Sequence, residues 1–295
     1  MTPKEYLENI LKGQQLNKKE LEALSDHREE VESTLREKYS NEPSIKYGGS
    51  KAKDTMIRES YDLDIICYFP NETDNSLKDI YDGVQNCLAS KYLVDPKTSA
   101  LRIMHIDENK IRTDYHIDVV PGKYTDESKS DAFLYLAKGE NQRIKTNLDV
   151  HIEHISKSGC RDAIKLAKLW KTRNNIPIKT FVLELMVIQS LKNSQHKDDL
   201  EMSLTKLFNV LHEDVIAVQL IDPANTNNVV SDLLSESDRV LIASGAQNSI
   251  DILNSENYDD VTKWRMIFKD NADDKTSLGP TIIIKKEPPK QWCYL

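Results

Sequence analysis

The chain has 295 residues, of which 39% are hydrophobic and 30% are charged, and its formal net charge is −8. This length holds one large domain or two ordinary ones, and the balance of apolar and charged residues excludes a disordered chain. The acidic balance disfavours a protein that coats nucleic acid, but it leaves small anionic ligands open, because a few local cations are enough to bind them.

The apolar runs and the cysteines disfavour further classes. No apolar run approaches the roughly 20 residues that span a bilayer, and the first residues lack the apolar core of a signal peptide. We therefore expect a cytoplasmic protein. The four cysteines are scattered without paired spacing, which argues against a disulfide framework and against a cysteine zinc site.

The first half of the chain mixes helix and strand patterns. A capping-box pair, Asn17 and Glu20, begins a helix predicted over 17–39. Residues 45–50 read as a short strand that ends in a glycine turn. The clearest strand is 61–69, because apolar side chains at every second position alternate with Asp62 and Asp64. A helix over about 77–92 follows, and then "LRIMHI" and "IRTDYHIDVVPG" predict a hairpin around "DENK".

The second half is dominated by helical patterns. They cover roughly 160–174, 180–193, 200–219, 237–254 and 258–269. Helices that follow a mixed sheet along the chain predict an α+β fold with two lobes. We place a sheet lobe with its long N-terminal helix at residues 1–150 and a helical lobe at residues 151–295.

The first chemical signal is the pair Asp62 and Asp64. They point the same way from one strand, about 6–7 Å apart, and they repel unless a cation lies between them. Magnesium suits such a pair, because it takes hard oxygen ligands and binds through one or two carboxylates together with substrate phosphates. A third carboxylate should come from a neighbouring strand, and Asp118 in "HIDVVP" is the leading candidate. Asp114 and His116 share its face and read as supporting or surface residues.

A glycine turn, Gly48-Gly49-Ser50, precedes these aspartates. Glycines let the backbone approach an anion closely, and successive N–H groups with a serine hydroxyl can hold phosphate oxygens. No GxxxxGK[ST] is present, so this is not a P-loop. Arg58 or Lys51 can neutralise further phosphate charge. On its own, such a turn is more often only a turn.

These motifs resemble the DNA polymerase β-like nucleotidyltransferase superfamily. The likeness is carried by "GGSKAKDTMIR", by the "DLDI" after it, and by the later aspartate in "DVVP". Two further segments, "KLAKLWKTRNNIPIKTFVLELMV" and "LIDPANTNNVV", are similar to the helical lobe of the oligoadenylate synthases and of the cGAS/DncV-like nucleotidyltransferases (CD-NTases). Together the similarities cover roughly residues 45–270.

The resemblance implies an active site in the cleft between the lobes. Gly49 and Ser50 would hold the donor triphosphate. Mg²⁺, with Mn²⁺ as a substitute, would be bound by the three catalytic aspartates, which are Asp62, Asp64 and Asp118.

The helical lobe would complete this site. Lys168, with Lys165 one turn away, would contact the phosphates, and Phe181 would stack on the base. The residue patterns alone leave blander interpretations open. Lysines at every third position are typical of a solvated helix face. For Phe181, a core position and stacking on the base are equally supported. Trp170 reads as core, and His151 and His154 read as a surface helix.

The resemblance further implies template-independent synthesis of a cyclic, or linear, oligonucleotide second messenger from NTPs, ATP among them, with release of pyrophosphate. The product would act on a separate effector protein in bacterial anti-phage signalling, without membrane binding or extensive nucleic-acid binding. One alternative is an enzyme that adds nucleotides to an RNA end, a small molecule or a protein, although the acidic charge disfavours RNA. Another is an inactive nucleotide-sensing module, which the presence of all three aspartates disfavours.

Overall fold

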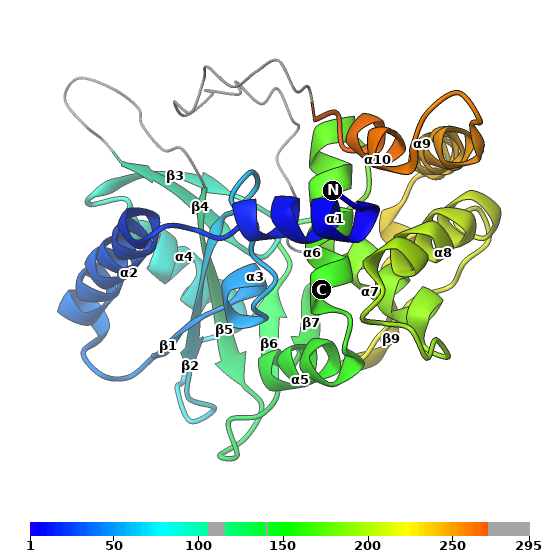
Figure 1. Cartoon of the computed structure of the whole chain (residues 1–295). Helices are drawn as coiled ribbons and strands as arrows, with labels where there is room; N and C mark the ends of the chain where they lie inside the picture. Colours follow the sequence, from blue (N-terminus) through cyan, green and yellow to red (C-terminus); the bar gives the residue numbers. More distant parts are fainter. Residues whose placement is uncertain (106–115, 140, 271–295) are drawn as a thin grey trace.

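The computed structural model describes residues 1–105, 116–139 and 141–270 (Figure 1). Its main sheet is mixed: β2 and β5 run parallel, and the other pairings between its described strands are antiparallel. The central order is β1 (Ser44–Tyr47), β2 (Leu63–Phe69), β5 (Ile117–Tyr124), β4 (Leu101–His105) and β3 (Tyr92–Pro96), with β6 (Ala132–Tyr135) beside β5 and β7 (Arg143–Thr146) beside β6.

One face of this sheet is covered by two helices, α2 (Lys18–Tyr39) and α4 (Leu77–Leu88) (Figure 1). Apolar side chains from both helices pack on the odd-numbered residues of β2, from Leu63 to Phe69. The even-numbered residues Ile66 and Tyr68 belong to a second cluster on the opposite face, so β2 is buried on both sides. The polar residues at the start of β2 lie on this second face, which is turned away from α2 and α4 and toward the rest of the molecule.

The helical lobe has its own core. It is formed by α6 (Arg161–Asn174), α7 (Thr180–Leu191), α8 (Leu200–Glu213), α9 (Glu236–Asn254) and α10 (Asp260–Ile267). The N-terminal helix α1 (Pro3–Gly13) adds Tyr6 and Leu7 to this core rather than to the sheet. The smaller elements are α3 (Gly49–Ala52), α5 (Leu148–Ser158), the hairpin of β8 (Ile221–Asp222) and β9 (Asn225–Val229), and the 3₁₀ helix η1 (Val230–Leu233).

The predicted α+β fold is confirmed, and most predicted elements are present. Asn17 and Glu20 form the expected capping box of α2. The helix predicted over 77–92 ends at Leu88, because Tyr92 already begins β3. The helix predicted over 200–219 ends at Glu213. The turn of the predicted hairpin lies outside the described residues, but its arms are the antiparallel pair β4 and β5. The division at residue 150 stays a prediction.

Helix α1 was not predicted, although the sequence signals for its start are local. Thr2 and Glu5 form a capping box, and Pro3 opens the first turn, where its missing N–H costs nothing. In the part of the chain that the structure describes, no helix combines the length and apolar character that a membrane crossing needs.

Candidate active site

The three predicted aspartates gather on one face of the sheet. In the parallel register of β2 and β5, Asp64 lies directly opposite Asp118, so both side chains point to the same side. Asp62 precedes β2 and shares that side by alternation, and its carboxylate accepts a hydrogen bond from the backbone N–H of His116 at 3.3 Å. This side is opposite to the one that α2 and α4 cover. The register thus creates the cluster that the sequence predicted.

Asp64 is the most unusual of the three. Its side chain is 2% exposed, and neither carboxylate oxygen has a hydrogen-bond partner among the described residues. Burial raises the pKa of Asp64 well above its usual value, and the neighbouring Asp118 and Asp62 raise it further, while the charges of Lys53 and Lys168 oppose this rise. Since buried polar groups are nearly always paired, two such oxygens are suited to binding a cation.

Gly49 explains why the turn before β2 contains glycine. Its φ of +49° lies in the left-handed region, and a Cβ there would come within 1.8 Å of the Asp64 Oδ2 atom. The backbone N–H of Gly48 also donates to the carbonyl of Asp64 at 2.8 Å. Ser50, which follows, is buried in the first turn of α3. The structure therefore places Gly49, with Ser50 beside it in the chain, against Asp64.

Asp118 is engaged by a residue that the sequence analysis missed. Arg102 lies opposite it in the β4–β5 register and donates to both of its carboxylate oxygens, from Nε and Nη2, at 2.8 Å each. Both side chains are buried. Burial raises the pKa of Asp118, and the Arg102 hydrogen bonds and charge oppose that rise. The signal was an arginine inside the apolar strand "LRIMHI".

Lys168 joins the site from α6. It is 4% exposed, and its Nζ donates to the carbonyl of Thr55 at 2.6 Å. Beside it, the ammonium of Lys53 pairs with the carboxylate of Glu184 on α7, and the Thr55 hydroxyl donates to Glu184 at 3.0 Å. Lys53 and Glu184 were not predicted from the sequence. The available signal was one acidic residue within the apolar run "FVLELMV".

Phe181 lies close to the same group. Its ring centroid is 5.4 Å from the Lys53 Nζ atom and 5.1 Å from the ring centroid of His151. The interpretation of His151 as a surface residue is wrong, because it is buried and its Nε2 atom lies 2.8 Å from Asp222 Oδ1. Asp222 belongs to the segment "LIDPANTNNVV", so this segment fastens α5 beside Phe181.

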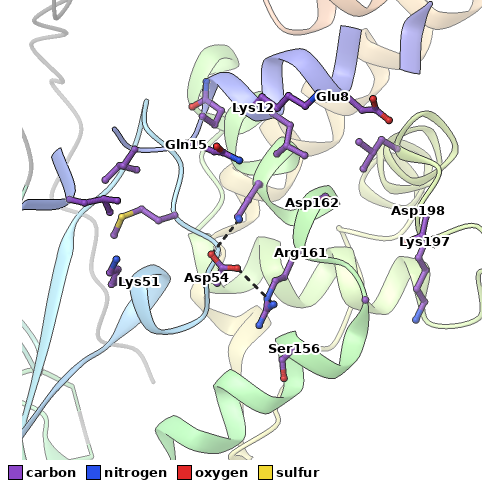
Figure 2. A pocket seen from close by; sticks show the side chains of 18 residues that line it. Glu8, Lys12, Gln15, Lys51, Asp54, Ser156, Arg161, Asp162, Lys197 and Asp198 are labelled. Atoms are coloured by element: carbon purple, nitrogen blue, oxygen red, sulfur yellow. Dashed lines mark hydrogen bonds and ion pairs between the residues drawn. The ribbon is translucent and has the colours of Figure 1, made fainter. Parts of the chain in front are cut away.

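Arg58 and Lys165 pair with carboxylates other than those of the three clustered aspartates. Arg58 is 46% exposed and pairs with Glu20 on α2 at 2.8 Å. Lys165 pairs with Asp54 at 3.5 Å. It lines a cavity of about 1000 Å³, where Figure 2 shows Arg161 also reaching Asp54. None of the three clustered aspartates lines this cavity. The nucleotide-binding roles of Arg58 and Lys165 stay predictions, with less geometric support than that of Lys168.

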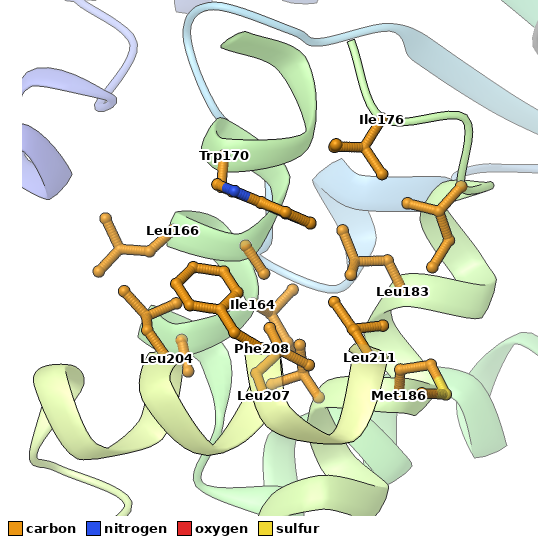
Figure 3. Close-up of a cluster of buried hydrophobic side chains, with 14 of the residues drawn as sticks. Ile164, Leu166, Trp170, Ile176, Leu183, Met186, Leu204, Leu207, Phe208 and Leu211 are labelled. Atoms are coloured by element: carbon orange, nitrogen blue, oxygen red, sulfur yellow. The ribbon is translucent and has the colours of Figure 1, made fainter. Parts of the chain in front are cut away.

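Trp170 has the core role that its pattern indicates. It is fully buried among the apolar side chains of α6, α7 and α8 (Figure 3). Its ring centroid is 5.1 Å from that of Phe208, and its Nε1 donates to the Ser249 hydroxyl at 3.0 Å. This packing fixes the helix that carries Lys168 two residues earlier.

With this geometry established, comparisons with known proteins are informative. No family model matches the sequence. The chain is 23% identical over 264 residues to a cyclic AMP-AMP-AMP synthase of Escherichia coli (strain MS 115-1), a match that covers 75% of this chain and 80% of that protein.

Solved structures extend the likeness. The E. coli MS115-1 CdnC structure with ATP has a TM-score of 0.68 and 20% identity, covering 90% of this chain and 96% of that one. The structure of the Bradyrhizobium diazoefficiens CD-NTase CdnG with GTP has a TM-score of 0.67 and 13% identity, covering 92% of this chain and 96% of that one. The structure of the Cid1 poly(U) polymerase has a TM-score of 0.64 and 12% identity, covering 90% of this chain and 98% of that one.

The chain has the fold of known nucleotidyltransferases. Within that class, the chain has the fold of the cGAS/DncV-like nucleotidyltransferases, and its match to a cyclic oligonucleotide synthase agrees with this. The resemblance read from the sequence is thereby confirmed.

Proposed function

We propose that this protein joins NTPs without a template, releases pyrophosphate, and produces a cyclic oligonucleotide. The observation that carries the proposal is Asp64, buried beside Gly49 with two carboxylate oxygens that have no partner among the described residues. A catalytic site gives this costly arrangement a reason that packing does not, because an unpaired buried carboxylate destabilises the fold. The cyclic AMP-AMP-AMP synthase relative supports ATP as one substrate.

The acidic group fits a divalent cation in part. Asp62 and Asp64 would hold Mg²⁺, or Mn²⁺ in its place, since hard cations prefer carboxylate oxygens. Asp118 would join them once Arg102 releases one of its oxygens. No group of three His, Cys, Asp or Glu side chains is arranged for metal binding among the residues that the structure describes. When bound, the metal would neutralise the charge that develops on the phosphates during transfer.

The remaining roles follow from charge and position. The backbone N–H groups at Gly49 and the Ser50 hydroxyl would bind the triphosphate, and Lys168 would neutralise part of its charge. An acceptor ribose hydroxyl would attack the α-phosphorus, pyrophosphate would leave, and Asp118 would accept the proton. Phe181 would contact the base. Phosphoryl transfer depends mainly on positioning and charge neutralisation, so no covalent enzyme intermediate is needed.

The product would activate a separate effector protein in bacterial anti-phage signalling. This role rests on the relationship to cyclic oligonucleotide synthases. The net charge of −8 supports small nucleotides, rather than long nucleic acids, as the main ligands.

A second candidate is the addition of nucleotides to an RNA end. The fold shared with the Cid1 poly(U) polymerase favours it, and the acidic charge of the chain disfavours it. Addition to a small molecule or a protein remains within the same chemistry. A nucleotide-sensing module without activity is disfavoured, because all three aspartates are present and clustered.

One experiment separates these functions. The full chain is incubated with all four labelled NTPs and Mg²⁺ or Mn²⁺, treated with phosphatase and analysed by chromatography. A phosphatase-resistant product formed without an added acceptor is expected. Product that forms only with RNA would favour tailing. No turnover under either condition, together with unchanged NTP binding by Asp64→Asn, would show that the site is not catalytic.

A further inference from the structure

Glu184 is a buried charge that the proposed chemistry does not use. It lies in the middle of α7, between the buried Leu183 and Leu185, and it is 0% exposed. Burial alone would raise the pKa of Glu184, but the charges of Lys53 and Lys168 outweigh it and lower the pKa. The residue is therefore ionised, and an ionised carboxylate at this depth depends on its cationic neighbours.

The groups that Glu184 holds come from the segment that follows the glycine turn. It accepts hydrogen bonds from the Lys53 ammonium and from the Thr55 hydroxyl, the latter at 3.0 Å. These residues lie 131 and 129 positions away in the chain. Thr55 is also tied to α6, because its carbonyl accepts the hydrogen bond from Lys168. Glu184 thus holds the segment that begins at Gly49 against the helical lobe.

The charge of Lys53 acts on two carboxylates. Its ammonium pairs with Glu184. Its charge also acts on Asp64, where it opposes the rise of the pKa that burial causes. Neither oxygen of Asp64 accepts a hydrogen bond in the described structure. The backbone N–H of Lys53 donates to the carbonyl of Gly49 at 3.2 Å, and a Cβ at Gly49 would come within 1.8 Å of the Asp64 Oδ2 atom, so Lys53 belongs to the short segment that packs on Asp64. Its ammonium is directed toward Glu184, and this choice of partner leaves the Asp64 oxygens open.

We propose that Glu184 is a positioning residue, which holds the Lys53 ammonium away from Asp64 and so keeps the Asp64 carboxylate available to a divalent cation. The inference rests on the proposed function, in which Asp64 binds that cation. Its physical basis is competition. A buried ammonium needs a counter-charge, and without Glu184 the carboxylate of Asp64 becomes that counter-charge. A Lys53–Asp64 pair and a metal ion then compete for the same oxygens.

A purely structural role for Glu184 makes a different prediction. If the residue only joins the two lobes, removing its charge lowers stability, and removing Lys53 as well lowers it further or leaves it unchanged. If it directs Lys53, removing its charge weakens metal binding, and removing Lys53 as well restores it. The two interpretations therefore differ in the double variant.

The test measures Mn²⁺ binding to the full chain without nucleotide, by electron paramagnetic resonance of unbound Mn²⁺. The variants are Glu184→Gln, Lys53→Gln and the combination of both. Glu184→Gln is expected to raise the Kd for Mn²⁺ by roughly 10-fold or more, as for other groups that orient metal ligands. The double variant is expected to return close to the parent value. Thr55→Val, which removes a Glu184 hydrogen bond but no charge, is the matched control and should stay near the parent.

Two results would overturn the inference: a folded Glu184→Gln variant with the parent's Kd, or a double variant as weak as the single one. If Glu184→Gln does not fold, Glu184→Asp replaces it, with a smaller rise in Kd expected because the shorter side chain holds Lys53 less well. A failure of the proposed function has a separate signature. In that case the parent binds no Mn²⁺, or Asp64→Asn binds it equally well.

Discussion

Arg102 on β4 and Asp118 on β5 form a buried bidentate ion pair, with both hydrogen bonds at 2.8 Å. The antiparallel register places the two residues directly opposite each other. Asp118 is in turn opposite Asp64 on β2, so one row across three strands reads arginine, aspartate, aspartate. Of the two aspartates in this row, only Asp118 has a counter-charge in hydrogen-bond contact among the residues that the structure describes. The row therefore combines one paired carboxylate with one whose oxygens accept no hydrogen bond from those residues.

The Arg102–Asp118 pair predicts the effect of removing the arginine. Arg102→Met leaves a buried carboxylate without its cation, and we expect the free energy of unfolding to fall by about 3–5 kcal/mol. Urea denaturation followed by circular dichroism measures this loss. The matched control is Arg58→Met, which breaks an exposed pair with Glu20 and should cost less than about 1 kcal/mol. Equal losses in the two variants would contradict the assignment.

The close approach of Gly49 to Asp64 predicts that Gly49→Ala loses nucleotidyl transfer. The added Cβ would collide with the Asp64 carboxylate, and the left-handed backbone adds strain of about 1–3 kcal/mol. Product formation from labelled NTPs is the measurement, with thermal unfolding as a check on stability. Gly13→Ala is the control, because a Cβ there meets nothing within 4 Å. Full activity of Gly49→Ala would show that the turn does not approach the reacting groups.

The raised pKa of Asp64 predicts a pH-dependent gain in stability for Asp64→Asn. In the metal-free protein, the folded state holds the Asp64 proton more tightly than the unfolded state, whose pKa is the usual 3.8. The favourable contribution of this carboxyl is complete below pH 3.8 and is lost as the pH rises through its folded-state pKa. Asp64→Asn has no such loss.

The stability of Asp64→Asn relative to the parent should therefore increase as the pH rises above about 4. Urea denaturation in EDTA, repeated at several pH values, tests this expectation. A difference that does not change with pH, or one that shrinks toward neutral pH, would contradict it. The same variant should form no product in the NTP assay.

The two lysines of α6 should differ in importance. Lys168 is buried at the site, so Lys168→Met is expected to reduce kcat/KM for NTPs on the order of 100-fold, as for the loss of one preorganised donor. Lys165→Met should have a much smaller effect, because Lys165 pairs with Asp54 and lines a cavity that none of the three clustered aspartates lines. Steady-state pyrophosphate release measures both. A larger loss at Lys165 would mean that the nucleotide lies on the cavity side of α6.

Local patterns explain which parts of the fold could be predicted. The capping box of α2 and the alternation along β2 involve neighbours within a few residues, so they are legible in the sequence. The end of α4 was misplaced, since the β3 strand that follows starts within the apolar pattern of the helix. His151 was misjudged for a different reason. Its burial depends on Asp222, which is 71 positions away.

By itself, the sequence determined the nucleotidyltransferase fold and predicted the aspartates that cluster, because a glycine turn and two alternating aspartates lie within one short segment. Only the tertiary structure decided the partners of these residues. The pairing of Arg102 with Asp118 follows from strand register, and that of Lys53 with Glu184 follows from the contact between the lobes. Charge pairing of this kind depends on distance in space, which no local spacing encodes. That Asp64 has no hydrogen-bond partner within the described parts of the chain is therefore visible only in the folded structure.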